Sequence, residues 1–308
     1  MELSLSSDQR ALLDSLEPLL EHHREIPQSE RRSRCYYSRG LERDLADAGY
    51  LDILRTEGNT ALEAALVVDA VAALPVTAEV ATSVLVAPQV LPPEVPRPFS
   101  ILYGPITRPQ RFLPVARTAL YDTGDDVLVI DVDPANVEAV EAIFAYPFGK
   151  FRTPPDLSKA RRLGAASVAK FRQWARVALA VECAAAGVAA TKFTVEYVKQ
   201  RIIFNRPLGS YQAVQHRLAS CHQLASGARL LALRAAWSGS PTDAALAATY
   251  AQMHIDRIRF DTHQFNGGMG LSNEHLLHFW TYRMVALASE LGGAGANAIA
   301  AAGQAFAA

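Results

Sequence analysis

Two segments in the second half of the sequence contain residue types that often contact ligands: arginine, glutamine and paired glycines. The first, RIIFNRPLGSYQAVQHRLA, runs from Arg201 to Ala219, and the second, HQFNGGMGLSNEHLLHFWTYR, runs from His263 to Arg283. Taken alone, Arg201 reads as a solvated helix-end cation and Gly267-Gly268 as an ordinary helix cap, while Gln212 indicates nothing. Only the joint spacing of these residues can therefore show whether they form a ligand site.

A third group, Glu274, His275 and His278, has the composition of a metal site on a helix. Bundle di-metal sites need two Glu-x-x-His pairs and two further carboxylates, and only scattered candidates exist. Helix packing and capping is therefore the favoured role of these histidines, and His22-His23 read as surface residues. The sequence also lacks a P-loop, a G-x-G-x-x-G run after a strand, a G-x-S-x-G elbow and H-E-x-x-H, which removes support from other common enzyme classes.

The spacing of both segments resembles the acyl-CoA dehydrogenase family. RIIFNRPLGSYQAVQHRLA resembles the signature in which R-x-x-F-G is followed by F-Q-x-x-Q-H-x-L-A. HQFNGGMGLSNEHLLHFWTYR resembles Q-x-x-G-G-x-G-x-x-x-E followed by a helix that ends in arginine. A weaker similarity at ERDLADAGYLDI extends the resemblance over nearly the whole chain. Asn205 replaces the usual glycine and tolerates a positive φ, and Tyr282 replaces an arginine found in many relatives.

The resemblance implies FAD as the cofactor, bound between subunits. It implies that Arg201 pairs with the pyrophosphate of a neighbour's FAD, a role that suits a forked, permanently charged guanidinium. Phe204 would pack beside this cofactor and Gln212 would hydrogen-bond to it. Gln264, Gly267 and Gly268 would form a turn that approaches it, because glycine permits close backbone contact.

The catalytic base of the family is missing from both of its usual positions. Dehydrogenation needs a carboxylate at the substrate α-carbon while the flavin accepts a hydride from the β-carbon. One family position falls on Ala175, next to Arg176, and the other on Leu291, or on Gly292 with a one-residue insertion. Glu290 is one place off and is the remaining candidate base, although a carboxylate there also reads as an exposed helix residue.

A second element of the family's active site is also missing. The T-E-P-x-x-G-S-D segment that touches flavin and substrate has no counterpart between Pro92 and Arg161. The pattern resembles the shortened, non-catalytic subunit of bacterial, steroid-catabolic heteromeric acyl-CoA dehydrogenases, whose E-H-x-x-H run also resembles residues 274–278. The resemblance implies an α2β2 heterotetramer with a related glutamate-bearing subunit, acting on an acyl-CoA.

Two other functions remain open. A self-sufficient homo-oligomeric dehydrogenase would use Glu290 as its base. A non-redox protein with the same fold, a scaffold or a lyase, would have lost the cofactor, which the retained Arg201, Gln212 and Gly267-Gly268 speak against.

The surrounding elements indicate a mainly α protein with a small β domain. Apolar residues recur at three and four positions from Ser7 to Leu91, which predicts packed helices. Four prolines in Leu91–Pro98 mark a boundary. Five short runs then predict strands: 101–106, 111–116, 118–123, 127–132 and 143–148. The expected domains are an N-terminal helical domain (1–95), a shortened β domain (96–157) and a C-terminal four-helix bundle (158–308).

The bundle contains the longest apolar periodic segments. They predict helices at 165–203, 211–238, 244–265 and 273–290, and the tail at 292–308 is left open. The 30 basic residues balance 31 acidic ones, which argues against nucleic-acid binding. Three separated cysteines and no signal peptide favour a reducing cytoplasm. The longest apolar stretch, Val177 to Ala190, is too short for a membrane span.

Overall fold

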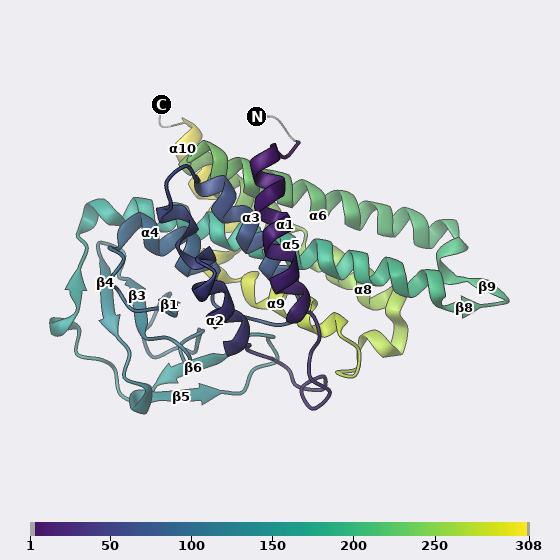
Figure 1. Ribbon diagram of the computed structural model, residues 1–308, viewed down its shortest axis with the longest axis horizontal. Helices are drawn as coiled ribbons and strands as arrows, with labels where there is room; N and C mark the ends of the chain where they lie inside the picture. Colours follow the sequence, from purple (N-terminus) through teal and green to yellow (C-terminus); the bar gives the residue numbers. More distant parts are fainter. Residues whose placement is uncertain (1–3, 307–308) are drawn as a thin grey trace.

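The longest helix, α5 (Ala165–Gln200), runs through the middle of the molecule (Figure 1). The computed structural model describes residues 4–306, and within them α5 packs against helices from both halves of the chain. Its central part, from Trp174 to Gly187, is buried almost without interruption. A helix that is apolar on all sides needs neighbours on all sides, so α5 is the core around which the other elements assemble.

The length and composition of α5 also meet the criteria for a membrane-spanning helix. Within residues 4–306, α5 passes this test alone, and Leu277–Leu287 with Glu290–Phe306 passes it as a pair bent by 69°. The most apolar window of α5 is 78% buried inside the protein. This burial is that of a core helix.

The N-terminal region is helical, as the periodicity predicted. Ser6 with Gln9, and Thr60 with Glu63, form capping boxes that start α1 and α3 and supply partners to otherwise free N–H groups. The helices here are α1 (Ser7–His22), α2 (Arg39–Asp47), η1 (Tyr50–Arg55), α3 (Ala61–Ala72), η2 (Thr82–Val86) and α4 (Ala87–Val90). His23 is half-buried and bonds to Asp44 at 2.7 Å, so its expected position on the surface was wrong.

Two small sheets form the β region at one end of the molecule (Figure 1). The first has the order β1-β3-β4-β7, with β1 parallel to β3 and the other pairs antiparallel; the second, β2-β6-β5, is antiparallel throughout. Their bounds are β1 Phe99–Leu102, β2 Gln110–Arg111, β3 Thr118–Asp122, β4 Val127–Asp131, β5 Val137–Val140, β6 Phe148–Phe151 and β7 Arg161–Arg162.

The strand predictions were partly wrong. The runs at 118–123 and 127–132 coincide with β3 and β4, but 111–116 is a turn after Arg111 and 143–148 is a loop up to Phe148. Phe112 has φ 66°, which no extended strand accommodates. The sequence pattern did not predict β5. Its Val-Glu-Ala-Val stretch is short and contains a glutamate, and in the structure it is only half-buried.

The C-terminal half is a helical bundle in which α5, α6 (Gln212–Ser238), α7 (Pro241–Met253) and α8 (Ile255–Gly270) pack together, with α9 (Leu277–Leu287) and α10 (Gly293–Phe306) against them. The fold class, mainly α with a small β region, is therefore confirmed. The predicted single helix 244–265 was wrong, because His254 (φ −101°, ψ 0°) separates α7 from α8. The helix predicted from 273 begins only at Leu277.

One hydrophobic core cluster reaches from Leu16 in α1 through Phe112 beside β2 to Leu287 in α9. The N-terminal helices, part of the β region and the bundle therefore share a continuous interior. The domain boundaries at 95 and 157 stay predictions.

Candidate functional site

A short hairpin with two-residue strands projects from the end of α5, at the opposite end of the molecule from the two sheets of the β region (Figure 1). Its strands are β8 (Ile202–Ile203) and β9 (Arg206–Pro207), and its turn residues Phe204 and Asn205 have φ of 50° and 63°. Two consecutive left-handed residues are typical of the tight turn that joins twisted strands. The turn leaves the Phe204 side chain 88% exposed. Asn205 thus adopts the positive φ that asparagine tolerates.

The second segment forms the end of α8. Gly267 has φ 57° and ψ −144°, a conformation in which a side chain would be strained. No atom lies within 4 Å of where a Cβ on Gly267 or Gly268 would sit. Glycine at 267 is therefore required by the backbone turn, and the space beside both glycines is open.

A small apolar cluster holds these two segments at the same end of the bundle. Phe265, from the last turns of α8, packs with Val198 of α5 and with Val214 and Leu218 of α6. Asn266 donates a hydrogen bond to Thr194 Oγ1 of α5 at 2.9 Å. The hairpin, the first turn of α6 and the end of α8 therefore form one surface, which we call the donor face.

Three polar side chains of the donor face are not engaged by the described residues. Arg201, Gln212 and Gln264 are exposed, and among residues 4–306 their side chains have no hydrogen-bond or ion-pair partner. A guanidinium, two amides and an open glycine turn are the chemistry that a phosphate-containing cofactor requires. The sequence-predicted FAD residues are therefore brought together in a state that is free to bind; their individual roles stay predictions.

The base positions lie far from the donor face. Ala175 is buried inside α5, and Leu291 has φ 54° in the turn after Glu290. Ala175 lies 25 residues before the end of the helix at Gln200, which at about 1.5 Å per residue is about 37 Å along the axis. Neither Ala175 nor Leu291 supplies a carboxylate, so Glu290 and its neighbours decide what chemistry is available.

Glu290 is engaged in a buried ion-pair triad with Arg111 and Glu182. Arg111 donates through Nε and Nη2 to the two Glu290 oxygens at 2.8 and 3.2 Å, and through Nη1 to both Glu182 oxygens at 2.8 and 2.9 Å. The side chains of Arg111, Glu182 and Glu290 are 12%, 7% and 14% exposed. Glu290 is therefore neither exposed nor free, and both of its oxygens are occupied.

Aromatic rings complete the surroundings of the triad. The Arg111 guanidinium lies 4.6 Å from the Tyr146 ring centroid and 4.9 Å from that of Phe112, distances at which a cation is attracted to a ring face. Burial disfavours the charged form of Arg111, but Glu182 and Glu290 outweigh it and raise the pKa of Arg111 well above its ordinary value. Burial raises the pKa of Glu290 while Arg111 opposes that shift. The arginine is thus permanently charged.

A polar network holds the turn that presents Glu290. Gln252 of α7 donates to the carbonyl oxygens of Leu287 and Glu290 at 2.8 and 3.0 Å. Asn297 of α10 donates to Gln252 at 2.9 Å and accepts from Arg176 of α5 at 2.8 Å. Three helices therefore fix the position of Glu290 opposite Arg111.

The triad separates two spaces of very different size. On one side a cavity of about 470 Å³ lies between the β region and the end of α9, with Arg111 and Glu290 in its wall. On the other side, the space beside Glu182, Tyr146 and Arg283 amounts to about 10 Å³, room for at most about one water molecule. No acyl chain fits beside Glu182 in this arrangement.

Sequence reasoning missed Glu182 and Arg111. The signal for Glu182 was available: it is the only charged residue in the apolar run Val177–Ala190, and a carboxylate buried in such a helix requires a partner. Arg111 gave no comparable signal, because only the fold brings it beside Glu182 and Glu290.

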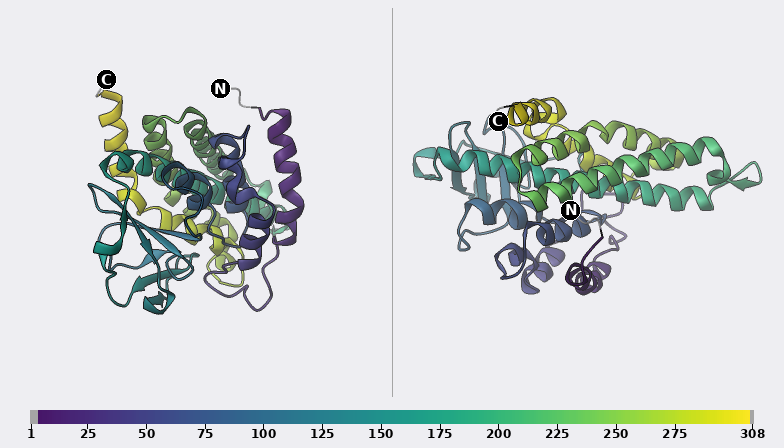
Figure 2. Two further views of the ribbon diagram at one scale, coloured as in Figure 1. Left: turned by 60° about the vertical axis from the view of Figure 1, so that its left-hand side comes forward. Right: turned by 90° about the horizontal axis from the view of Figure 1, so that it is seen from above.

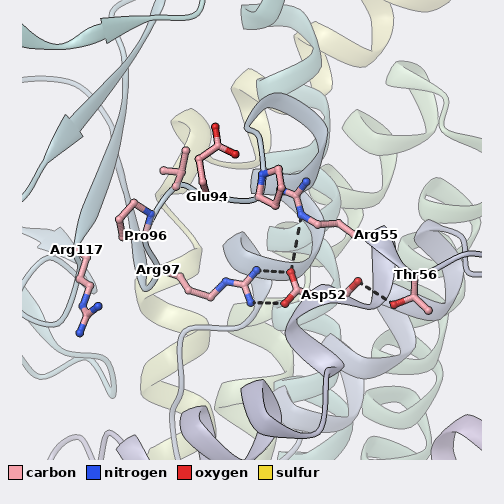
Figure 3. A pocket seen from close by; sticks show the side chains of 9 residues that line it. Asp52, Arg55, Thr56, Glu94, Pro96, Arg97 and Arg117 are labelled. Atoms are coloured by element: carbon pink, nitrogen blue, oxygen red, sulfur yellow. Dashed lines mark hydrogen bonds and ion pairs between the residues drawn. The ribbon is translucent and has the colours of Figure 1, made fainter.

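Another open cleft, of about 650 Å³, lies where η1 meets the proline-rich segment (Figure 3). Arg97 forms a two-point contact with Asp52 at 2.6 and 3.1 Å, and Arg55 approaches the same carboxylate at 3.9 Å. Arg117 points away from this pair (Figure 3). Arg97 and Arg55 are therefore engaged by Asp52, and the Arg97–Asp52 contact fastens the proline-rich segment to the N-terminal helices.

The histidines of the second segment serve packing. His278 is buried, with its ring nitrogens 2.8 and 2.9 Å from the carbonyl oxygens of His275 and Ser33. His275 lies against the rings of Phe193 and Tyr197. Among residues 4–306, no group of three metal-ligating side chains comes together.

Comparisons with known proteins agree with this geometry. Residues 163–304 match the model of the acyl-CoA dehydrogenase C-terminal domain. The acyl-CoA dehydrogenase IpdE2 of Mycobacterium tuberculosis is 34% identical over 109 residues, which are 35% of this chain and 34% of that protein. The sequence match thus spans about a third of the length of this curated relative.

Two solved structures share the fold over almost the whole chain. One is the ChsE4-ChsE5 complex from Mycobacterium tuberculosis, with a TM-score of 0.75, 20% identity and 97% of both chains covered. The other, a Tcur3481-Tcur3483 steroid ACAD variant, has a TM-score of 0.77, 20% identity and 98% of both chains covered. FAD is the cofactor that the matched family indicates. Residues 163–304 therefore match the acyl-CoA dehydrogenase C-terminal domain, and the chain shares its fold with these two solved structures over nearly its whole length.

Proposed function

We propose that this chain is the non-catalytic subunit of a heteromeric, FAD-dependent acyl-CoA dehydrogenase. It would use its donor face to complete the FAD site of a related, glutamate-bearing subunit. The observation that carries the proposal is the contrast between the two ends of the molecule. Arg201, Gln212 and Gln264 are exposed at one end and have no side-chain partner in the described part of the chain, whereas Glu290 is held by Arg111 in the interior.

The chemistry of the reaction explains why the locked carboxylate matters. FAD supplies the hydride acceptor, and a carboxylate must remove the proton from the substrate α-carbon. A base needs a free lone pair within hydrogen-bond reach of that proton. In this chain the Glu290 carboxylate is held in a two-point ion pair with Arg111, which fixes its orientation and stabilises its charge. We therefore assign the base to the partner subunit.

The similar structures support the choice of partner and substrate class. Both solved relatives carry two protein names in one complex, and one of them is described as a steroid ACAD. We therefore place this chain in an α2β2 heterotetramer that oxidises an acyl-CoA, with a steroid-derived acyl group as the leading candidate. Arg201 would contact the pyrophosphate of the partner's FAD, and Phe204 would pack beside it.

A self-sufficient dehydrogenase is the second candidate, because Glu290 borders the cavity of about 470 Å³ between the β region and α9. That function requires Arg111 to release Glu290. It predicts a yellow lone chain that oxidises an acyl-CoA, whereas the heteromer predicts flavin and turnover only after assembly.

The decisive experiment is expression of the chain alone and with a glutamate-bearing acyl-CoA dehydrogenase subunit from the same genome. Flavin absorbance and native mass would be recorded for each purified species. FAD in a heterotetramer, absent from the lone chain, is the expected result. Turnover by the lone chain would replace the proposal with the Glu290 mechanism.

A variant tests the pyrophosphate contact inside the assembled complex. Arg201→Ala should lower the FAD content of the heterotetramer severalfold, since a charge-assisted fork is lost. Arg161→Ala is the matched control, an exposed arginine on β7 in the β region. Equal FAD content in both variants would remove Arg201 from the cofactor site.

A further inference from the structure

The cavity of about 470 Å³ beside Glu290 has the size of a small-molecule site. The β region supplies most of its lining and the end of α9 the rest, and the left view of Figure 2 shows the yellow C-terminal helices running down to the teal strands. Its lining includes exposed residues, such as Arg108 and Ser289, and buried ones, such as Gln110 and Ala286. This feature, which we call the β–α9 cavity, therefore has a mouth at the surface and an inner end within the protein.

The walls of the β–α9 cavity are apolar and in part aromatic. Phe144 and Phe148 line it with their ring centroids 5.4 Å apart. Ile101 of β1, Val140 of β5 and Ala286 of α9 extend the apolar lining. Ring faces and branched aliphatic side chains favour a flat, apolar ligand. The middle of the cavity therefore suits a ring system and not a charged group.

The inner end of the cavity accepts hydrogen bonds. The triad there contains two carboxylates and one guanidinium, so it carries one net negative charge. Each Glu290 oxygen accepts one hydrogen bond from Arg111, and a carboxylate oxygen has room for a second. A ligand hydroxyl could therefore donate to Glu290, whereas a ligand anion would be repelled at this end.

Tyr103 adds a hydrogen-bond donor to the same lining. Burial, and then the charge of Glu290, raise the pKa of its hydroxyl well above the ordinary value, so this group stays protonated. Gln110 binds the backbone of Tyr103, but among residues 4–306 the hydroxyl itself has no hydrogen-bond partner. A ligand hydroxyl, which both donates and accepts, would satisfy Glu290 and Tyr103 together.

The mouth of the cavity presents a free positive charge. Arg108 ends a turn that its amide closes by donating to the Pro105 oxygen at 3.0 Å. Its guanidinium is exposed, without a side-chain partner in the described part of the chain. Glu141, an acid at the same mouth, is bound by Arg34 at 3.1 Å. The anionic end of a ligand would therefore meet Arg108.

We propose that the β–α9 cavity binds a free carboxylic acid that has a flat, apolar ring system and a hydroxyl at its far end. The rings lie between the apolar walls, the carboxylate faces Arg108, and the hydroxyl bonds to Glu290 and Tyr103. A thioester lacks the anionic carboxylate, so the site distinguishes a free acid from an acyl-CoA. The inference goes beyond the proposed function, because this ligand is neither the acyl-CoA nor the cofactor of the partner subunit.

Three naphthalene probes test the polar contacts by isothermal titration calorimetry of the full chain. The complete probe is 6-hydroxy-2-naphthoate; 2-naphthoate lacks its hydroxyl, and methyl 6-hydroxy-2-naphthoate lacks its charge. Loss of the hydroxyl should weaken binding about tenfold, because a hydrogen bond to a charged group is lost. Loss of the charge should weaken binding about threefold, since Arg108 is exposed, and salt should reduce this difference.

Two substitutions assign these differences to residues. Arg108→Gln should make 6-hydroxy-2-naphthoate and its methyl ester bind equally, and Tyr103→Phe should reduce the advantage of 6-hydroxy-2-naphthoate over 2-naphthoate. Arg152→Gln and Tyr121→Phe change residues outside the cavity lining and are the matched controls. Equal effects in a variant and its control would remove that residue from the site.

A filled cavity shows whether the probes bind there. Ala142 is half-buried in the lining, and Ala139 is exposed on β5 outside it. Ala142→Trp should abolish detectable binding of 6-hydroxy-2-naphthoate, whereas Ala139→Trp should leave the affinity unchanged. Thermal melts of both variants verify the fold.

The expected result is binding of 6-hydroxy-2-naphthoate that depends on the hydroxyl, on the charge and on the open cavity. No binding to the unchanged chain, full binding to the Ala142→Trp variant, or equal affinity with and without the hydroxyl would overturn the inference. Displacement of the probe by FAD would assign the cavity to a flavin and overturn it as well. These titrations use neither the partner subunit nor turnover, so failure here leaves the heterotetramer experiment to decide the proposed function separately.

Discussion

Arg111, held between Glu182 and Glu290, binds two carboxylates at once. A guanidinium can do this because its donors point in several directions of one plane, which an ammonium group cannot match. The desolvation of three charges offsets much of their attraction. The triad is therefore a device that fixes geometry more than one that adds stability.

This balance leads to a prediction about stability. Arg111→Met alone should destabilise the chain by about 3–5 kcal/mol, because it leaves two carboxylates buried without a counter-ion. Arg111→Met combined with Glu182→Met and Glu290→Met should recover most of that loss, since apolar residues of similar volume replace the whole triad. Urea denaturation of the three proteins would measure both steps.

The outcome that contradicts this interpretation is specific. A single Arg111→Met variant as stable as the unchanged protein would mean that the carboxylates reach solvent or become protonated without cost. Arg24→Met is a useful reference, because Arg24 also binds two carboxylates, those of Glu17 and Glu21, but all three side chains are at least 46% exposed, and its loss should cost much less.

Residue identity predicted one part of the site and not the other. The residues from Arg201 to Gln212 and from Gln264 to Gly268 lie close together in the sequence, so a spacing pattern could single them out, although their roles toward FAD stay predictions. Asn205, a residue that tolerates a positive φ, adopts one, whereas the positive φ of Phe204 was not predicted. The triad joins β2, α5 and the turn after α9 across 179 positions of sequence, and no local pattern encodes such a contact.

Among the elements, long helices were predictable and their interruptions were not. The limits expected for α5 and α6 agree with the structure to within three residues, because Pro207, Gly209 and Gly239 stop the apolar periodicity. The break at His254 falls between two segments of the same periodicity, with no proline or glycine to announce it. The strand predictions failed where prolines and tight turns shorten a strand to two residues, as in β2.

The ion pair between Asp52 of η1 and Arg97 of the proline-rich segment predicts how the stability of the chain depends on pH. The hydrogen bond from Arg97 lowers the pKa of Asp52 in the folded chain. A depressed carboxyl pKa contributes stability above the unfolded value, about 3.9, and that contribution is lost as the pH falls through the lower folded value. Because the Asp52 side chain is 48% exposed, the contribution is at most about 1 kcal/mol.

Asp52→Asn should therefore lower the Tm at neutral pH and have no effect in strongly acidic solution, where the wild-type carboxyl is protonated as well. Asp125→Asn, an exposed carboxylate for comparison, should change the Tm little at any pH. A constant difference for Asp52→Asn at all pH values would show that packing, and not the ion pair, fastens this segment. Scanning calorimetry across the acidic range makes the measurement.

At the scale of the whole molecule, the exposed hairpin predicts a chain that gains stability from its partner. Ligand binding to the folded state adds about 2.7 kcal/mol at a hundredfold excess over Kd, so the Tm of this chain should rise with partner concentration. Phe204→Asn, which keeps a residue tolerant of the left-handed turn, should leave the Tm of the lone chain unchanged and reduce that rise.

Ile143→Asn provides the comparison for this measurement. Ile143 is 56% exposed in the β region, at the other end of the molecule from Phe204, which is 88% exposed. If both variants reduce the rise equally, general surface polarity is responsible, and the hairpin has no special role in assembly. Thermal melts at several partner concentrations distinguish the two cases.

The single helix α5 fixes both the distance and the rotation about its axis between Glu182 of the triad and the hairpin. Each residue advances the helix by about 1.5 Å and turns it by about 100°. One residue inserted between Glu182 and Gln200 would therefore swing the hairpin to a different side of the molecule. Seven inserted residues would nearly restore its direction but carry it about 10 Å outward. The number of residues in α5 thus sets the distance and direction from the triad to the exposed hairpin. Insertions or deletions keep that direction only when they add or remove nearly whole helical turns.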